Sequence, residues 1–298
     1  MSDFLDRYSI QRWLEMCPQG YLMGTTYGHD PGQAEPDELL ENEALREDAI
    51  RTTVQLVVGE RCALAASSGL VNAAPDQASK TFLATQTLDE ARHVEIFTKR
   101  LRDLGVAADR VEATIEHFAN PNLVKFAEVL LAKVDAGDFI AGVVGQNIVL
   151  EGMAFSVFEM MEAMSRTANP KFAKTLSGTI ADERRHVGFG ENRIGGLIRE
   201  HPEKKAEIQD MQAEMTYWML ATFSDSFRNT EQILDEAHRV AEKSGVGEGS
   251  AVWHGTDLAT ASAEEMEAVL AGTVLDEFRT RLARIGLEYK SPPTPAGV

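Results

Sequence analysis

The sequence predicts an all-α protein built as a bundle of long helices. Helix-forming residues dominate the chain, and the alternation of apolar and polar residues that marks surface strands is nearly absent. The chain has 298 residues and 44% hydrophobic residues, enough for one large core and too many for a disordered chain. We expect a single domain over 1–298, with the bundle core at about 37–243 and a C-terminal loop, helix and tail at 244–298.

The individual helices follow from the residues that interrupt the helical pattern. Pro75 opens one helix and Gly105 closes it, while Pro170 and Pro202 each begin another. Lengths near 30 residues correspond to rods of about 45 Å, and such rods joined by short loops form antiparallel bundles. Helices are expected at 37–71, 75–104, 121–135, 137–167, 170–200, 203–243 and 262–285, and irregular structure at 17–36, at 245–260 and from 291 onward.

Charge and composition narrow the range of partners. The chain holds 29 Lys and Arg against 47 Asp and Glu, a net charge of −18, which disfavours nucleic acid and anionic membrane surfaces. The apolar run 139–158 is long enough to span a bilayer, but Gln146, Asn147 and Glu151 lie in its middle, where a carboxylate is costly. Two cysteines and no secretory leader predict a cytoplasmic protein without a membrane segment.

Two segments occur twice in the chain. TLDEARHVEIF (87–97) parallels IADERRHVGFG (180–190), and LVVGERCALA (56–65) parallels NIVLEGMAFS (147–156). The two copies are offset by 91 residues from Glu60 to Glu151 and by 93 from His93 to His186. The sequence therefore predicts two helix hairpins of similar design, related by an approximate twofold axis.

The repeated segments carry metal-ligand chemistry. Glu90 and His93, and again Glu183 and His186, stand three residues apart and so share one helix face. About thirty residues before each pair, Glu60 and Glu151 stand alone in apolar company, and thirty residues lead up one helix and back down the next to the same level. Four carboxylates and two imidazoles facing one point is the arrangement of di-iron and di-manganese carboxylate proteins.

Burial of this cluster without metal ions would be energetically unfavourable. Each uncompensated carboxylate in a protein core costs several kcal/mol, and Arg92 and Arg185 supply only two positive charges. Two divalent metal ions would supply the remainder. We therefore expect a metal centre whose ligands also form its active site, with no separate catalytic side chain.

The segments VGERCALA, DEARHVEIF, NIVLEGMAF and DERRHVGFG resemble the ferritin-like dimetal-carboxylate superfamily. The similar branch holds the small subunit of ribonucleotide reductase, the ligand-binding oxidases and bacterial multicomponent monooxygenases, and the segments look closest to the ligand-binding oxidases. The resemblance covers roughly residues 45–200. It implies a ferritin-like helical bundle with a four-helix dimetal core and additional helices, assembled as a homodimer.

The resemblance also implies a role for each ligand. Glu60 and His93 would hold one metal, Glu151 and His186 the other, and Glu90 and Glu183 would bridge them. Two iron ions are expected, with a Mn/Fe pair as the alternative. Around the ligands, Asp182 would accept the outer N–H of His93 and Asp89 that of His186, with Arg92 and Arg185 paired to these aspartates across the hairpins.

Three positions depart from the relatives. Phe97 stands where the ribonucleotide reductase subunit usually keeps its radical tyrosine, so radical storage by that tyrosine is not expected. Gln146 and Ala63 stand where the ligand-binding oxidases form a cross-link between a tyrosine and a branched aliphatic residue, so that cross-link cannot form. A substrate pocket is expected among residues within about one turn of the ligands, namely Ala63, Leu64, Ser67, Phe97, Gln146, Phe155 and Gly190.

The function expected from these features is that of a dioxygen-activating oxidase or monooxygenase. It would oxidise a small organic substrate at a C–H or N–H bond, with amine N-oxygenation as one form. The chain has no Gly-rich phosphate loop after a strand, so electrons would come from a separate reductase or ferredoxin. The alternatives are a Mn/Fe ligand-binding oxidase that binds a fatty acid, a radical-generating ribonucleotide reductase-like subunit and, outside enzymes, an iron storage protein.

Overall fold

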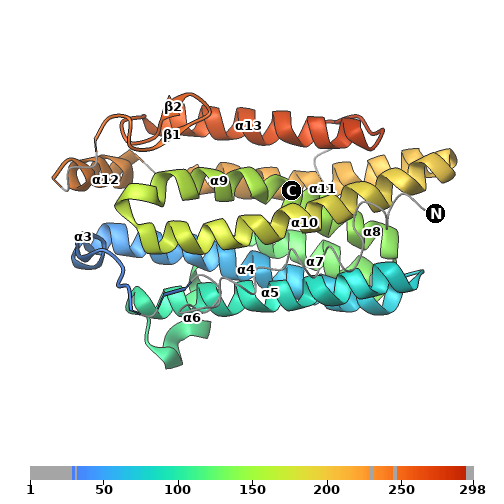
Figure 1. The fold of residues 1–298 in the computed structure, drawn as a ribbon, viewed down its shortest axis with the longest axis horizontal. Coiled ribbons are helices and arrows are strands. Elements are labelled where there is room, and N and C mark those ends of the chain that lie inside the picture. Colours follow the sequence, from blue (N-terminus) through green and yellow to red (C-terminus); the bar gives the residue numbers. More distant parts are fainter. Residues whose placement is uncertain (1–28, 31, 228–230, 244–246, 293–298) are drawn as a thin grey trace.

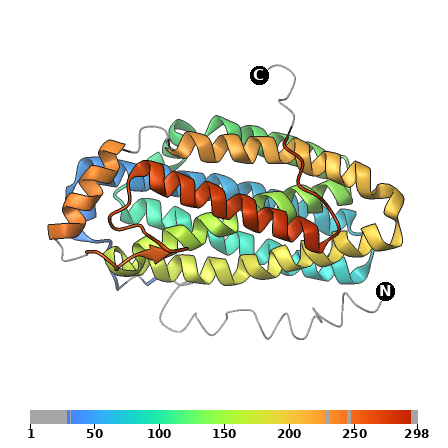
Figure 2. The same ribbon diagram turned by 90° about the horizontal axis from the view of Figure 1, so that it is seen from above.

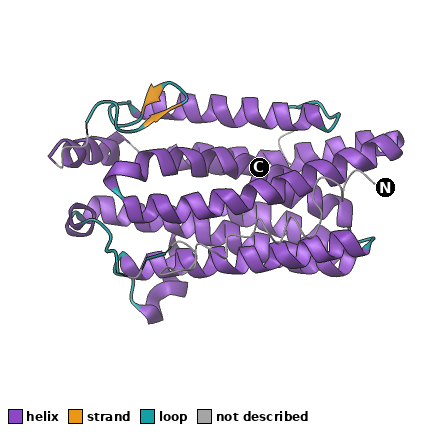
Figure 3. Ribbon diagram, in the orientation of Figure 1, coloured by secondary structure: helices purple, strands orange, loops and turns teal. Residues whose placement is uncertain are grey.

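A computed structural model gives the fold of residues 29–30, 32–227, 231–243 and 247–292. It is an all-α bundle, as predicted, and a short hairpin is the only pair of strands within these ranges (Figure 3). The helices are α3 (Asp37–Glu41), α4 (Glu43–Ala73), α5 (Gln77–Asp103), α6 (Val111–Phe118), α7 (Pro121–Asp135), α8 (Phe139–Val143), a π-helix (Val144–Leu150), α9 (Glu151–Ala168), α10 (Pro170–Glu200), α11 (Lys205–Phe227), α12 (Glu231–Lys243) and α13 (Ala263–Arg284), with 3₁₀ turns at Ala108–Arg110 and Pro202–Lys204.

Two long hairpins form the centre of the bundle. Helix α4 packs along α5, and α9 with its preceding π-helix packs along α10 (Figure 1). Helices α7 and α11 cover the outer side of α4 and of the π-helix, and α13 lies over α9 (Figure 2). The two repeated segments of the sequence thus occupy the four central helices.

Side-chain caps set where the long helices begin. The carboxylate of Asp76 accepts the amide N–H of Ser79 at 2.8 Å at the start of α5, and Asn169 accepts that of Phe172 at 3.0 Å at the start of α10. Pro170 occupies the first position of α10, where a missing N–H costs nothing. These boundaries agree with those expected from the sequence.

Two expected helices are each divided in the structure. The segment 37–71 is broken at Asn42, which leaves helical geometry and accepts the amide N–H of Leu45 to begin α4. The segment 203–243 forms α11 and α12, which lies across the end of the bundle (Figure 2). Asn42 also donates to Glu236 of α12 at 2.7 Å, so the break joins the covering elements at this end.

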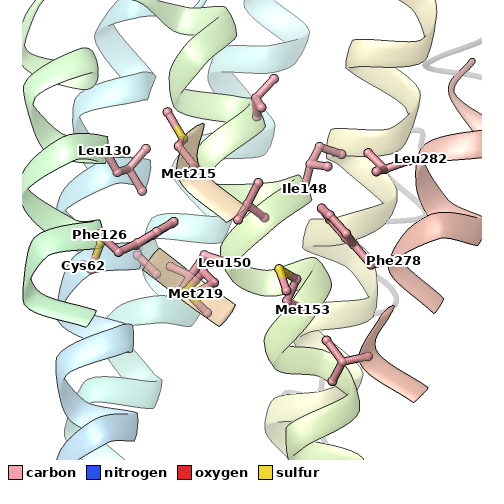
Figure 4. Close-up of a cluster of buried hydrophobic side chains, with 14 of the residues drawn as sticks. Cys62, Phe126, Leu130, Ile148, Leu150, Met153, Met215, Met219, Phe278 and Leu282 are labelled. Atoms are coloured by element: carbon pink, nitrogen blue, oxygen red, sulfur yellow. The ribbon is translucent and has the colours of Figure 1, made fainter. Parts of the chain in front are cut away.

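The expected helix 137–167 contains a π-helix, which helical periodicity alone does not predict. All seven residues Val144–Leu150 are buried. Gly145 permits the close packing, because a Cβ there would lie 2.5 Å from the Sδ of Met215. Figure 4 shows Ile148, Leu150 and Met153 between the methionines of α11 and the side chains of α13. The wider turn places residues 146 and 147 beside the carboxylates described below.

Two small elements are additional to the expectation. Helix α6 lies in a stretch between two expected helices, and buries Val111 and Ile115 against the bundle. The expected loop 245–260 contains an antiparallel pair of strands, β1 (Val252–Trp253) and β2 (Thr256–Asp257). The turn between them uses positive φ angles at His254 and Gly255, which suits the twist of a two-residue hairpin.

Two helical segments are long and apolar enough to cross a membrane by length and composition. They are Glu43–Ala73 and the continuous run Phe139–Ala168, and the most apolar window of the latter is 83% buried inside the bundle. A span that faces protein over most of its surface is typical of the core helix of a large bundle.

We expect Gly190→Ala to destabilise the protein by about 1–3 kcal/mol, because its new Cβ would lie 2.5 Å from the Cβ of Asn147 and 3.4 Å from its carbonyl carbon. Gly196→Ala, on the same helix, meets only the end of the Arg199 side chain at 3.9 Å and should stabilise by up to about 1 kcal/mol. Urea unfolding of both variants tests this, and equal effects would show that α10 does not pack closely on residue 147.

Candidate metal centre

The six predicted ligands converge in the middle of the four central helices. The Nδ1 atom of His93 lies 3.2 Å from a carboxylate oxygen of Glu60, 3.3 Å from one of Glu90 and 3.3 Å from one of Glu183. Each of these side chains is buried. The four residues therefore offer one nitrogen and three oxygens to a single point.

A second group forms around the other histidine. The Nδ1 atom of His186 lies 3.2 Å from Glu90, 3.4 Å from Glu183 and 3.8 Å from Glu151. Glu90 and Glu183 each reach both histidines, Glu90 through its two different oxygens. Glu90 and Glu183 therefore lie between the two histidines, and the assignment of ligands to two metals stays a prediction.

The donor set fits two divalent ions. Each Nδ1 faces oxygens of three glutamates, yet one N–H can donate fully to only one of them. Oε2 of Glu90 and Oε2 of Glu183 accept no hydrogen bond among the described residues although each lies within 3.4 Å of a histidine nitrogen. Carboxylate and imidazole donors around open positions suit iron or manganese.

The outer nitrogens of both histidines face aspartates. Nε2 of His93 lies 3.3 Å from Asp182, and Nε2 of His186 lies 3.4 Å from Asp89, so each contact crosses from one hairpin to the other. These partners fix the ring orientation and leave Nδ1 to face the carboxylates.

The two arginines hold these aspartates in place. Arg185 donates to Asp89 across the hairpins at 3.0 Å and also to Asp182 on its own helix. Arg92 donates to Asp89 on its own helix at 3.0 Å. The pairing across the hairpins that the sequence suggested is therefore seen directly for Arg185.

Burial and mutual contact shift the protonation of the cluster. Burial raises the pKa of Glu60 to about 8, against the opposing effect of His93, and burial with nearby Glu183 raises that of Glu151 well above its usual value. Burial alone would lower the pKa of each imidazole, but Glu60 beside His93 and Glu90 beside His186 hold both pKa values well above the ordinary one. Without metal, the cluster holds extra protons.

Three amide side chains surround Glu151, and sequence reasoning identified only one of them. Gln86 donates to Glu151 at 2.7 Å and to Glu90 at 3.2 Å. Asn147 and Gln146 donate to Glu151 at 3.0 and 3.2 Å. Gln86 stands one turn before Glu90, which is the signal that could have identified it.

A cavity of about 730 Å³ opens beside the cluster. Glu60, Glu151 and Glu183 form part of its wall. The lining follows one face of α4 over 45–63 and of α9 over 150–168, and elements α3 and α12 close the other end. Most of the wall is apolar, and five methionines contribute to it, namely Met160, Met161, Met164, Met219 and Met266.

Of the seven expected pocket residues, only Ala63 belongs to this wall. Phe97 packs in a separate apolar cluster, and Gly190 touches Asn147. Leu64, Ser67, Gln146 and Phe155 also lie outside the cavity lining. Spacing along a helix does not predict on which side of the cluster a cavity lies. This cavity lies on the side of Glu60, Glu151 and Glu183.

The two positions expected to lack the relatives' cross-link face each other. Gln146 donates from its Nε2 to the backbone carbonyl of Ala63 at 3.1 Å, while also donating to Glu151. A hydrogen bond therefore joins α4 to the π-helix at this point.

A third group with metal-binding residue types lies near the surface. Glu159, His254 and Glu277 bring ligand atoms within 4.8 Å of one another. Arg184 lies 4.0 Å from Glu159 and Arg281 lies 4.0 Å from Glu277, so the two carboxylates already have cationic neighbours.

Comparison with solved structures identifies the fold. No family profile and no curated sequence matches the chain. A variant of an R2-like ligand-binding oxidase with an anaerobically reconstituted Mn/Fe cofactor superposes with a TM-score of 0.75 at 16% identity, over 93% of both chains. Another variant of that oxidase gives 0.71 at 15% identity, over 96% of this chain and 99% of the other. A Synechococcus protein with aldehyde deformylating oxidase activity gives 0.60 at 16% identity, over 85% and 94%.

The chain therefore has the ferritin-like fold of the dimetal-carboxylate proteins, with the Glu and His clusters buried at its centre. The likeness extends beyond the resemblance noted from the sequence, because the superposed share includes most of the segment after residue 200.

Metal affinity should rise with pH up to about 8, because the bound form needs ionised Glu60 and a neutral Nδ1 on both histidines. Lower pH favours the protonated, metal-free cluster. Titration of metal-free protein with Mn²⁺ between pH 6 and pH 8 should give tighter binding and proton release in weak buffer. Binding that is independent of pH would contradict the shifts.

Proposed function

We propose that this protein is a dioxygen-activating dimetal oxidase or oxygenase that acts on an elongated, largely apolar organic substrate. The observation that carries the proposal is the meeting of two features: three of the four clustered glutamates, Glu60, Glu151 and Glu183, are also part of the wall of the large cavity. A molecule in that cavity would lie directly against the metal ligands.

The ligands, the residues around them and the cavity wall would each have a separate role. The six ligands would hold two iron ions, or one manganese and one iron, which supply the activation of dioxygen. Asp89 and Asp182 orient the histidines from behind. The apolar wall would exclude water, so that the activated oxygen reacts with the substrate.

The shape of the cavity favours a long substrate over the small one expected from the sequence. Its lining extends along α4 from Leu45 to Ala63, a span of nineteen residues that corresponds to about 27 Å of helix. Methionine side chains adapt to flexible apolar chains. Besides the ligands, the charged lining residues are Glu38, Asp48 and Arg100, and each lies about two helical turns or more along the chain from the nearest ligand, so the segment nearest the metals would be alkyl. These features support C–H oxidation over amine oxidation.

The structural neighbours support the same class. One is a ligand-binding oxidase with a Mn/Fe cofactor and another has aldehyde deformylating oxidase activity. A radical-storing reductase subunit is less well supported, because Phe97 is fully buried among apolar side chains at the position expected for a radical tyrosine. We infer a separate reductase or ferredoxin as electron donor and a homodimeric assembly, as the resemblance suggests.

Glu151→Ala should lose at least one metal per chain and all dioxygen-dependent turnover, because it removes a ligand of the His186 position. Elemental analysis of protein produced with both iron and manganese gives the metal content. Glu162→Ala, a partly buried glutamate on the same helix outside the cluster, is the control. Absence of bound metal in the unmodified protein after reductive reconstitution would overturn the proposal.

Ala154→Phe should abolish binding of long-chain ligands while keeping the metals, because residue 154 lines the cavity one turn from Glu151. Thermal unfolding with a series of fatty acids and fatty aldehydes reports ligand binding, and elemental analysis reports the metals. Ala65→Phe, on the exposed face of α4, serves as control. Unchanged stabilisation by the ligands in Ala154→Phe would show that the substrate binds elsewhere.

A further inference from the structure

The two metal positions differ in the side chains that surround their terminal carboxylates. Oε1 of Glu151 accepts hydrogen bonds from Gln86 at 2.7 Å and from Gln146 at 3.2 Å, and Oε2 accepts one from Asn147 at 3.0 Å. All four residues are buried. We call Gln86, Gln146 and Asn147 the amide cradle.

The amide cradle is fixed by its own hydrogen bonds. Asn147 donates to the Oε1 atom of Gln86, which determines that the Nε2 atom of Gln86 faces Glu151 and Glu90. The Nδ2 atom of Asn147 also lies 3.2 Å from the backbone carbonyl oxygen of His186, so its two N–H bonds are shared among three acceptors, and Gln146 donates to the backbone carbonyl of Ala63. The cradle therefore connects the π-helix to α4, α5 and α10.

Counting acceptor sites shows what remains for a metal. A carboxylate oxygen offers about two lone-pair positions. Oε1 of Glu151 already accepts from Gln86 and Gln146, whereas Oε2 accepts from Asn147 alone. Glu151 is thus held in one orientation. Both acceptor positions of its Oε1 atom, which lies 3.8 Å from Nδ1 of His186, are taken, so a metal at this position would use the open acceptor position of Oε2.

Among the described residues, the Glu60 position has no equivalent of the cradle. At the repeat offsets of 93 and 91 residues, Gln86 corresponds to Thr179, Asn147 to Leu56 and Gln146 to Gln55. Thr179 bonds to its own helix, and Gln55 donates to the backbone of Phe118 and Arg51. Among the described residues no amide side chain donates to Glu60, whose partner is His93.

We propose that the amide cradle makes the two positions inequivalent, so that the Glu151/His186 position binds its divalent metal first and more tightly. This inference rests on the proposed dimetal function. A ligand held in its bound orientation loses less freedom when metal binds, and partners behind metal ligands typically contribute 10–100-fold to affinity. Glu60 has His93 as its hydrogen-bond partner and no amide donor among the described residues, so its carboxylate is held by fewer contacts and its metal binds second.

The test is a titration of metal-free protein with Mn²⁺ alone, in which electron paramagnetic resonance measures the unbound ion. The unmodified protein should bind two ions in two resolved steps. Gln86→Met, which keeps the side-chain length and removes the hydrogen bonds, should weaken the tighter step by 10–100-fold. Thr179→Val, which changes the counterpart of Gln86 in the repeat, should leave both steps unchanged.

Two further variants assign the steps. Glu151→Gln should remove the tighter step and Glu60→Gln the weaker one. Gln146→Met removes a second cradle donor and should weaken the tighter step in the same way, which keeps the test decisive if Gln86→Met fails to fold. Unfolding of the metal-free variants in urea separates a loss of affinity from a loss of structure.

Three results would overturn the inference while leaving the dimetal function intact: two equal steps in the unmodified protein, unchanged steps in both cradle variants, or loss of the tighter step in Glu60→Gln. Absence of Mn²⁺ binding in every form, together with absence of iron, would instead overturn the proposed function. The two failures are therefore distinguishable.

Discussion

The burial of four carboxylates and two imidazoles in one place is the constraint on which the rest of this structure depends. Such a cluster is stable in a core only when cations, hydrogen-bond donors and rigid helices compensate it. The long hairpins bring the groups to one level, and Asp89, Asp182 and Arg185 tie the hairpins together around them. Without metal, burial raises the pKa of Glu60 and Glu151, so the cluster takes up protons. Bound metal ions would replace these protons.

The internal repeat accounts for the near-symmetry of the metal ligands, and its divergence accounts for the asymmetry of their surroundings. The repeated segments supply equivalent ligands from the two hairpins. Their surroundings have diverged: the amide cradle, with two of its residues on the π-helix, surrounds Glu151, whereas the corresponding positions around Glu60 include Thr179 and Leu56 within regular helix. The fold thus keeps a near-symmetrical set of ligands inside an asymmetrical environment, in which the two metal positions need not behave alike.

The sequence predicted those features that depend on spacing along a helix. The E-x-x-H pairs, their distant glutamates and the aspartates behind them are all separated by whole helical turns or whole hairpins, so their meeting could be predicted. Asn147 was missed because its role depends on the widened turn of the π-helix. Gln86 stands one turn before Glu90, but its hydrogen bond to Glu151 depends on packing between helices, which spacing does not give. The cavity residues were mostly missed because the side on which space opens depends on how α11, α12 and α13 cover the bundle. The expected helix 37–71 is interrupted at Asn42, because the side chain of Asn42 caps the start of α4.

The methionines of the cavity wall have a chemical consequence of their own. A thioether is readily converted to the sulfoxide by oxygen-transferring species. Met160, Met161 and Met164 lie on α9 beyond Glu151, so an alkyl chain bound in the cavity as proposed would shield them. Turnover without substrate would therefore oxidise methionines of the cavity wall to methionine sulfoxide. The positions of the oxidised methionines would show the route by which the oxidant leaves the metal centre.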